Sequence, residues 1–504
     1  MNCKAQFRSF SGRAKVTQVA RAHPMVWILR AHGRGGREAW PHPRACPSPR
    51  RKVHCNLLRF ATTMPSRLFA LALILASAGL AASERPNLLL ILADDLGYGD
   101  LSSYGSEIRT PRIDSLAREG ARLEAFYAAA PVCTPSRYGL LTGRHPERSA
   151  DNLLAPLMFL QARDDRRGLR AHEITIARVL RDRGYRTAVI GKWHLGHGEP
   201  GFFPQRHGFD HAYGCHGGAI DFLTRRYGEK PDWFRNSQPI AEEGYVTDLI
   251  SDEAVAWLRA QRPDTPFFLY LAYTAPHYGK GWDPEKRQPT NILQSKADGR
   301  DRNAHIADPR RREYAGMVTA MDDGVGRVLA ALREARLDAN TLVILTSDNG
   351  GDLDYGGHNG ALRGEKSQLF EGGIREPCLM RWPGRISAGR VIREPVTGLD
   401  LFPTLAELAG AERPPFALDG TSIVSLLLGT GAPDPERLLF WSAPRAQAVR
   451  RGAWKWVHED GRHHLFELSA DPGEASDLSA LQPGLMKELQ SRHATWLRDA
   501  RGGR

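Results

Sequence analysis

Asn87-Leu-Leu-Leu-Ile-Leu-Ala-Asp-Asp95 is the stretch that points most directly to the fold, because an unbroken apolar run ends there on two adjacent carboxylates. A run without polar alternation is typical of a strand buried on both faces of a parallel sheet. Three more runs have this character, at 187–190, 267–272 and 342–346. Amphipathic stretches that predict helices lie between them, at 111–119, 174–183, 247–260 and 309–336. This alternation predicts a doubly wound α/β fold, with a large, mixed, mostly parallel sheet sandwiched by helices.

The pattern changes after about residue 404. Short stretches at 438–441, 448–449, 454–457 and 464–468 predict antiparallel strands, and 484–498 predicts a closing helix. Trp454 and Trp456 alternate along one of these strands, and we expect them to pack rather than to bind a sugar. We therefore expect a large α/β domain over 84–410 and a smaller α+β domain with a short antiparallel sheet over 411–504.

The net charge of +12 is concentrated at the start of the chain. Residues 1–63 hold 13 Lys and Arg and a single acid, Glu38, so that 64–504 is neutral. A neutral main part argues against a nucleic-acid partner. Residues 1–63 show no apolar period, and we interpret them as a basic leader that is either untranslated or disordered.

Residues 64–83 have the features of a secretory signal peptide. Arg67 precedes the apolar run 68–82, and small residues around 76–78 and 81–82 suit cleavage. The run is too short to span a bilayer of about 30 Å, and no Cys follows it, so we expect no stable membrane anchor. We expect translation to start at Met64 and the product to be periplasmic or extracellular, or lysosomal in a eukaryote. An organelle transit peptide and a basic nucleic-acid-binding tail are the alternatives.

Each buried run is followed by residues that can perform chemistry. Ligand sites in open α/β sheets lie beyond the carboxyl ends of the strands, so we expect these residues at one edge. They are Asp94, Asp95, Lys192, His194, His277, Asp348 and Asn349. The two acidic pairs offer hard oxygen ligands that suit Ca²⁺ or Mg²⁺ better than zinc. A lone Asp-Asp pair often only caps a loop, but two pairs after two buried strands favour a metal site.

Two helix starts carry sequence signals. Thr110 is the expected N-cap of the helix at 111–119, with Pro111 at its first position. In Cys133-Thr-Pro-Ser-Arg137, Pro135 suits a first helical position, which places Cys133 just before a helix N-terminus where backbone N–H groups attract anions. From the residues alone, Cys133 is either a low-pKa thiolate nucleophile or a small buried residue.

The segment Cys133-Thr-Pro-Ser-Arg-Tyr-Gly-Leu-Leu-Thr-Gly143 resembles the first signature of the type I, formylglycine-dependent sulfatases, C-x-P-S-R-x-x-x-L-T-G, at every fixed position. The segment 184–194 resembles their second signature, and similar family motifs occur at 94–100, 207–210, 347–350, 371–375, 400–404 and 471–474. The resemblance covers about 85–480. It is to the arylsulfatase A and N-acetylgalactosamine-6-sulfatase branch of the alkaline phosphatase superfamily, and it implies an alkaline-phosphatase-like fold and sulfuric ester hydrolase activity.

The resemblance also implies roles for individual residues. Cys133 would be oxidised to formylglycine (3-oxoalanine) by a maturation enzyme and would act as an aldehyde hydrate. One Ca²⁺, with Mg²⁺ as the alternative, would be held by Asp94, Asp95, Cys133, Asp348 and Asn349. The remaining roles are a brace at Arg137, neutralisation of sulfate oxygens by Lys192 and Lys366, a base at His194 and a general acid at His277. Cys215 and Cys378 match no catalytic motif, and we expect structural thiols or one disulfide.

The substrate is indicated only by resemblance. The segment 216–221 and the mixed C-terminal domain are similar to exo-acting glycan sulfatases, which implies a sulfated carbohydrate or an aryl sulfate, and we expect the loop 283–311 to shape the leaving-group pocket. One alternative is a phosphatase, phosphodiesterase or phosphonate monoester hydrolase of the same superfamily, whose two-zinc members often have Asp-His where this chain has Asp348-Asn349. The other is a non-catalytic glycan-binding relative.

Overall fold

The computed structural model describes residues 85–412, 414–431 and 434–502. The expected leader over 1–63 and the expected signal peptide over 64–83 lie outside the described residues. Within the described ranges, no helix combines the length and the apolar character that crossing a membrane requires.

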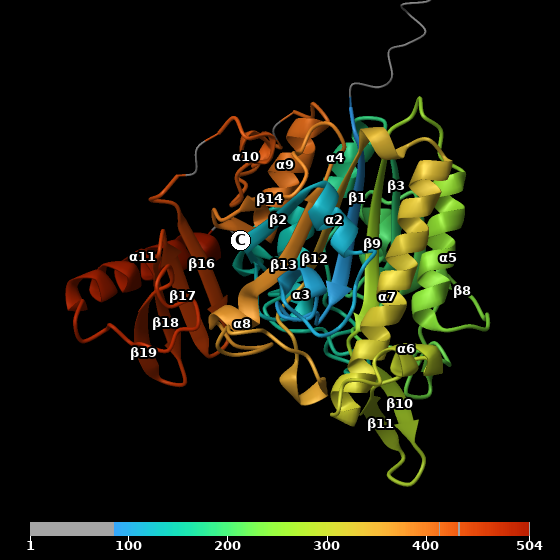
Figure 1. Cartoon of the computed structure of the whole chain (residues 1–504), viewed down its shortest axis with the longest axis horizontal. Coiled ribbons are helices and arrows are strands. Elements are labelled where there is room, and N and C mark those ends of the chain that lie inside the picture. The colour runs from blue at the N-terminus through green and yellow to red at the C-terminus, as the bar shows by residue number, and fades with distance from the viewer. Residues whose placement is uncertain (1–84, 413, 432–433, 503–504) are drawn as a thin grey trace, which may run out of the picture. The chain divides into compact units, whose positions relative to one another are not determined.

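A mixed sheet of eleven strands forms the centre of the fold (Figure 1). In spatial order its strands are β14 (Arg390–Ile392), β2 (Ala121–Tyr127), β13 (Arg375–Arg381), β12 (Thr341–Ser347), β1 (Asn87–Asp94), β9 (Phe267–Pro276), β3 (Arg186–Lys192), β4 (His211–Cys215), β7 (Phe234–Arg235) and β8 (Gln238–Pro239), with β15 (Val396–Thr397) also paired to β2. The five strands from β12 to β4 run parallel, while β13 and β7 are antiparallel to their neighbours. The predicted fold class is confirmed.

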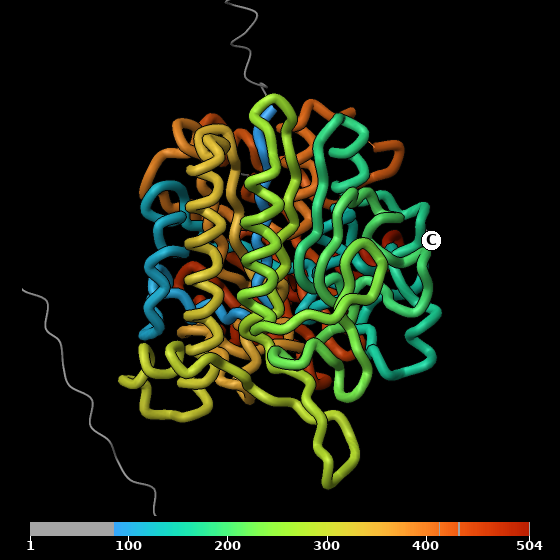
Figure 2. The backbone as a smooth tube through the Cα atoms, turned by 90° about the vertical axis from the view of Figure 1, so that its right-hand side faces the viewer, coloured from blue at the N-terminus to red at the C-terminus, as the bar shows by residue number. Residues whose placement is uncertain are grey.

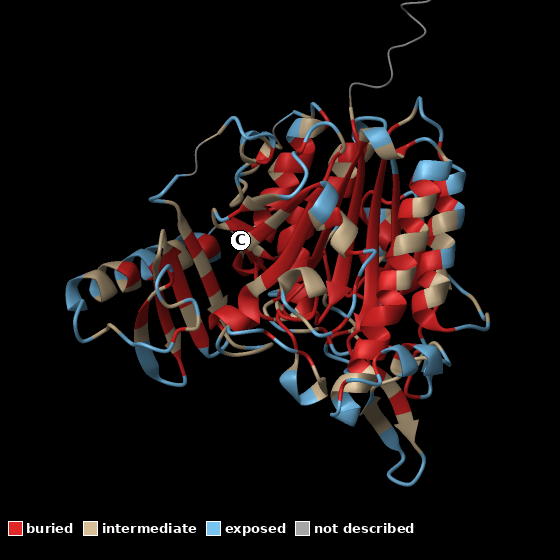
Figure 3. Cartoon of the chain, in the orientation of Figure 1, coloured by how far each residue is buried: buried red, intermediate tan, exposed pale blue. Residues whose placement is uncertain are grey.

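The apolar run that predicts the central strand is explained by two cores. Along β1, Leu89, Ile91 and Ala93 point into one core, and Leu88, Leu90 and Leu92 point into the other. A strand with a core on each face needs apolar side chains at every position, since successive side chains point to opposite faces. Figure 3 shows the central strands buried along their length.

Helices cover both faces of the sheet. The first core is closed by α2 (Asp114–Glu119), α5 (Val246–Arg259) and α7 (Pro309–Glu334), and α6 (Ala297–Arg302) packs on α7. The second core is closed by α3 (Cys133–Thr142), α4 (Ile176–Asp182), α9 (Leu401–Leu408) and α10 (Val424–Leu428). Figure 2 shows α5 and α7 lying side by side. The short α8 (Glu371–Ile374) leads directly into β13.

The predicted start of α2 is wrong. The helix begins at Asp114 with Ile113 as its N-cap residue, and the hydroxyl of Thr110 donates to Asp114 Oδ1 at 3.1 Å instead of capping a helical N–H. The cause is a tertiary contact: the Asp322 carboxylate on α7 accepts the backbone N–H groups of Arg112 at 3.0 Å and Ile113 at 2.8 Å. By contrast, α4 begins after a genuine cap, because the Thr175 side chain accepts the N–H of Arg178 at 3.2 Å.

The C-terminal part contains the predicted small antiparallel sheet. Its strands are β16 (Leu438–Ala443), β17 (Ala446–Arg451), β18 (Trp454–Glu459) and β19 (Arg462–Glu467), and α11 (Pro483–Gly502) closes it. Trp454 and Trp456 pack with Leu489 of α11, as expected. Two further short sheets are formed by β5 (Arg226–Tyr227) with β6 (Lys230–Pro231), and by β10 (Gly279–Asp283) with β11 (Gln288–Ile292).

A buried ion-pair cluster ties the small sheet to α8. Lys455 Nζ on β18 lies 2.8 Å from Glu371 Oε1 and 3.0 Å from Glu474 Oε1, and all three side chains are fully buried. The other oxygen of Glu371 accepts from the hydroxyl of Tyr127 at 2.7 Å. One ammonium between two buried carboxylates is tolerable only while each charge is compensated, so this cluster is sensitive to the protonation of its acids.

Glu474 is the acid of this cluster that titrates near neutrality. Burial raises its pKa from an ordinary value of 4.5 to about 7, with Lys455 opposing the shift and Glu371 adding to it. A folded-state pKa above the unfolded value gives stability that is complete below pH 4.5 and is lost as the pH rises through 7. Glu474→Gln removes this titration, so between pH 5 and 8 the wild type should lose about 1–3 kcal/mol more unfolding free energy than the variant.

The measurement is urea unfolding of both proteins at the two pH values, with Glu436→Gln, an exposed glutamate, as the matched control. Equal losses of unfolding free energy in the wild type and in Glu474→Gln would show that Glu474 does not titrate in this range.

Candidate active site

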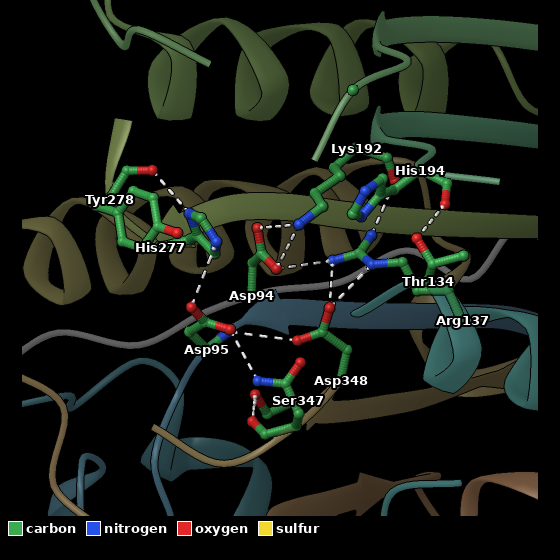
Figure 4. A network of polar contacts seen from close by, with 12 residues as sticks. Asp94, Asp95, Thr134, Arg137, Lys192, His194, His277, Tyr278, Ser347 and Asp348 are labelled. Atoms are coloured by element: carbon green, nitrogen blue, oxygen red, sulfur yellow. Dashed lines mark hydrogen bonds and ion pairs between the residues drawn. The ribbon is translucent and has the colours of Figure 1, made fainter. Parts of the chain in front are cut away.

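The chemistry-bearing residues meet at the carboxyl edge of the central strands (Figure 4). Strand β1 ends at Asp94, and β12 is followed by Asp348. The two strands run parallel in register, with Ala93 opposite Ser347, so the acids after them leave the sheet side by side. Strand β3 ends at Lys192 and β9 leads to His277, with β9 lying between β1 and β3. The structure therefore brings together the residues that the sequence places after the four buried runs.

A glycine allows β3 to approach its neighbour at this edge. Gly191 has a φ of +115°, and a Cβ atom there would lie 1.8 Å from the carbonyl oxygen of Ala272 on β9. Only glycine tolerates both the positive φ and the contact. Glycine at position 191 is thus required for the backbone to bring Lys192 to this edge of the sheet.

Arg137 and Lys192 neutralise two of the buried carboxylates. Lys192 Nζ lies 2.7 Å from both oxygens of Asp94. The guanidinium of Arg137 joins the two acids, donating through Nε to Asp348 Oδ2 at 2.9 Å and through Nη2 to Asp94 Oδ1 at 3.3 Å. All four side chains are fully buried. Such charges remain buried only because every one has an opposite partner.

Asp95 is held by a second group of partners. Lys366 Nζ forms an ion pair with Asp95 Oδ2, and His277 Nε2 lies 3.4 Å from the same oxygen. Burial alone would raise the pKa of Asp95, but Lys366 and then His277 outweigh it and hold the pKa well below its ordinary value. Burial alone would lower the pKa of Lys366, but Asp95, with smaller contributions from Cys133 and Tyr278, raises it well above its ordinary value.

The residues present fit a divalent cation. Carboxylate oxygens of Asp94, Asp95 and Asp348 lie within 4.8 Å of one another. Asn349 donates through Nδ2 to Asp95 Oδ1 at 2.8 Å, while its Oδ1 is buried with no hydrogen-bond partner. Three carboxylates and an unpaired amide oxygen form a hard-oxygen set of the kind that binds Ca²⁺ or Mg²⁺. Burial, aided by the neighbouring Asp348 and Asp95, raises the pKa of Asp94 to about 8 despite Lys192, so the charged form of this carboxylate is costly at this position.

Cys133 is the first residue of α3, so the prediction that Pro135 starts this helix is wrong by two residues. The cause lies in the backbone: Val132 is the extended N-cap residue, and its carbonyl accepts the N–H of Ser136 at 3.2 Å. Burial, only partly offset by Lys192, raises the pKa of the Cys133 thiol to about 11. This direction of the pKa shift argues against the low-pKa thiolate interpretation of Cys133.

The other two cysteines of the described residues are free thiols. Cys215 and Cys378 are both buried, and neither is bridged. Of the two alternatives for this pair, the structure shows structural thiols, and the disulfide alternative is wrong.

His194 presents an unpaired ring nitrogen. It has a φ of 55°, and its Nε2 donates to the carbonyl of Leu157 at 2.9 Å, which leaves Nδ1 buried without a partner. Burial and then Lys192 hold the pKa of His194 well below its ordinary value. A neutral imidazole with a free Nδ1 lone pair can accept a proton.

A cavity of about 420 Å³ opens over the site. Cys133, His194, His277 and Lys366 line it, so four of the six predicted catalytic residues face one space, while Arg137 and Lys192 lie buried behind it. Its other walls are apolar or charged, with Leu157, Met158, Ala219, Tyr227, Lys280, Asp352, Asp354 and Glu365 among them. A volume of this size suits a small-molecule ligand.

Sequence reasoning missed most of these wall residues. The expected pocket loop, 283–311, contributes none of the lining residues, although Asn291 in this loop holds the side chain of Lys280, which does line the cavity. Its residues instead form strand β11 and helix α6, which packs on α7. Of the segment 216–221, Gly218 and Ala219 do line the cavity. No motif marks Lys280 or Asp352, and only long-range packing could have revealed them.

Buried acids with cationic partners, a hard-oxygen cluster that could hold a metal ion and a cavity at the edge of a mixed α/β sheet are the features expected of a hydrolase that acts on an anionic ester. The family model "Sulfatase" matches residues 86–411, and the model "N-sulphoglucosamine sulphohydrolase, C-terminal" matches 364–499. The chain belongs to the sulfatase family, and it is an enzyme that hydrolyses sulfate esters.

Similar proteins share most of this chain. Arylsulfatase A of Bos taurus is 37% identical over 477 residues, which cover 82% of this chain and 86% of the relative. N-acetylgalactosamine-6-sulfatase of Canis lupus familiaris is 35% identical over 482 residues, which cover 83% and 87% of the two chains. Among solved structures, Ps i-CgsB in complex with k-i-k-neocarrahexaose matches with a TM-score of 0.75 and 33% identity, covering 83% of this chain and 94% of that one.

Cation binding should stabilise the folded protein, because the unfolded chain cannot assemble the oxygen cluster. Adding Ca²⁺ to chelator-treated protein should raise the thermal midpoint, and at a hundredfold excess over Kd the stabilisation should reach about 2.7 kcal/mol. Asn349→Ala should lose most of the shift, since it removes the unpaired Oδ1. Differential scanning calorimetry measures the shift.

Asp354→Asn, which neutralises an exposed carboxylate at the cavity wall, should keep the full shift and is the matched control. An unchanged midpoint in the wild type, or the same shift in Asn349→Ala, would contradict a cation site at this cluster.

Proposed function

We propose that this sulfatase acts on terminal sulfate esters of glycans, using a formylglycine made from Cys133 and one Ca²⁺, with Mg²⁺ as the alternative. The observation that carries the proposal is that the Cys133 sulfur lies within 4.8 Å of ligand atoms of Asp94 and His277. The side chain that would be modified therefore belongs to the same cluster as the oxygen donors. Asp94, Asp95, Asp348, Asn349 and the modified Cys133 would hold the cation.

The unmodified thiol is a poor nucleophile in this position, because burial raises its pKa to about 11. Oxidised by a maturation enzyme, the side chain would supply a geminal diol, with one hydroxyl to attack sulfur and a second whose deprotonation releases sulfate. A bound divalent cation would supply electrostatic stabilisation of the sulfate oxygens.

His194 would take the proton from the second hydroxyl. Its Nδ1 is unpaired, its pKa is held well below its ordinary value by burial, and it lines the same cavity as Cys133. The carbonyl of His194 accepts from the hydroxyl of Thr134 at 3.1 Å, so the base is tied to the helix that carries Cys133. The neutral ring is thus available as an acceptor at neutral pH.

The cationic residues would bind and orient the sulfate. Lys366 reaches the cavity beside Asp95, and Lys192 reaches Asp94 from behind. Arg137 donates through Nη1 to the carbonyl of Lys192 at 2.9 Å. This hydrogen bond ties the end of strand β3, where Lys192 lies, to helix α3, which carries Arg137. His277, whose Nε2 lies near Asp95, would contact the leaving oxygen as general acid, with Lys366 beside it.

A cavity of about 420 Å³ supports a substrate whose terminal sugar enters it, which means an exo-acting enzyme. Similarity to N-acetylgalactosamine-6-sulfatase and to the solved complex with k-i-k-neocarrahexaose also supports a sulfated carbohydrate. A broad aryl sulfatase is the alternative. The proposal includes export through the signal peptide that ends near residue 83, without a membrane anchor.

Conversion of Cys133 is tested by tryptic mass spectrometry of the peptide that carries it. Active enzyme should carry the aldehyde at position 133, and Cys133→Ser should lower turnover of 4-nitrophenyl sulfate by at least about a thousandfold, because a serine lacks the second hydroxyl. Cys215→Ser, which changes a buried cysteine away from the cavity, is the control and should keep its aldehyde.

An active enzyme whose Cys133 is an intact thiol would refute the formylglycine mechanism. Full turnover by Cys133→Ser would refute the nucleophile assignment itself.

A further inference from the structure

We propose that Lys280 binds a second anionic group on the leaving sugar, so that the preferred substrates carry another sulfate or a carboxylate beside the sulfate ester that is cleaved. This inference rests on the proposed function and specifies its substrate class. It starts from one feature of the cavity, an ammonium group that lacks an acidic partner.

Lys280 on β10 lines the same cavity as Cys133 and is half-buried. In the part of the chain that the structure describes, it forms no ion pair with an acid, and its Nζ donates to the amide oxygen of Asn291 at 2.5 Å. The ring of Tyr227 lies 5.8 Å away and gives only partial compensation. Burial lowers the pKa of Lys280, and no neighbouring carboxylate opposes that shift.

Among the described residues, none of the acids of the cavity wall forms an ion pair with Lys280. Lys366 forms an ion pair with Asp95. Burial raises the pKa of Asp352 to about 6, and Lys366 is the main charge that opposes this rise. The carboxylate of Glu365 accepts a hydrogen bond from the backbone N–H of Leu353 at 3.0 Å. Lys366 is therefore neutralised within the protein, whereas Lys280 is the cavity cation whose partner a ligand has to bring.

Lys280 is also held in place. Its carbonyl accepts the N–H of Gly228 at 2.8 Å, and the Asn291 amide that binds its Nζ donates on to the hydroxyl of Tyr355 at 2.6 Å. The Tyr355 ring packs on Tyr278 at 4.2 Å, and Tyr278 packs on His277 at 4.1 Å. A chain of contacts thus joins the ammonium to the reacting groups, and a fixed cation at a fixed offset can select a second charge by position.

A solvated lysine with no ligand is the ordinary alternative for a charged residue at a cavity wall. Two observations argue against it: the side chain is half-buried, and it is fixed at both its backbone and its tip. A free, solvated lysine would need neither contact.

The test compares matched sugars as substrates and as competitors of 4-nitrophenyl sulfate: a hexosamine with one sulfate, the same hexosamine with two, and a disaccharide with one sulfate and one uronate. The wild type should prefer a doubly anionic sugar by about tenfold or more, and Lys280→Met should reduce that preference to about twofold. Comparison of the two doubly anionic sugars shows whether the second group is a sulfate or a carboxylate. The preference should also weaken when salt is raised from about 0.05 to 0.5 M.

Lys286→Met is the matched control, since it removes an exposed lysine from the same hairpin and should keep the preference. Lys280→Arg should keep most of it as well, which separates loss of charge from misfolding. Equal wild-type affinity for singly and doubly anionic sugars, or an unchanged preference in Lys280→Met, would overturn the assignment of Lys280. Failure of the wild type to cleave any sulfate ester would instead overturn the proposed function.

Discussion

The burial of Asp94, Asp95 and Asp348 within 4.8 Å of one another is the constraint on which the rest of the structure depends. Carboxylates in this position repel each other and lose their hydration, so each needs a cation. Arg137 from α3, Lys192 from β3 and Lys366 from a loop supply three, and each comes from a different part of the fold. Burial still raises the pKa of Asp94, and a divalent cation bound to this cluster would favour the charged form of the carboxylate.

The same arrangement explains how an enzyme for anionic substrates can be neutral over most of its length. The net charge of +12 belongs to residues 1–63, and the rest of the chain carries equal numbers of acids and bases. Attraction of a sulfate ester would therefore depend on a few fixed charges at the cavity, and we propose Lys366 and Lys280 among them. Such charges act strongly because they lie in a partly buried site where water screens them less.

The sequence predicts those parts of the molecule that depend on local pattern. The apolar run of β1 and the acids after it could be read directly, because a strand between two cores must be apolar and parallel strands deliver their ends to one edge. The start of α2 could not, since Asp322, more than 200 residues away, decides it. No sequence motif marks Lys280 or the Lys455 cluster, because their interactions involve partners that only the folded chain brings together.

We expect this charge-balanced site to hydrolyse sulfate esters in preference to phosphate esters. The most direct test is the ratio of kcat/KM for 4-nitrophenyl sulfate and 4-nitrophenyl phosphate, measured with metal-loaded protein whose Cys133 has been converted to the aldehyde. The sulfate should be favoured by at least about tenfold, a transition-state difference of about 1.4 kcal/mol. Faster cleavage of the phosphate would contradict it.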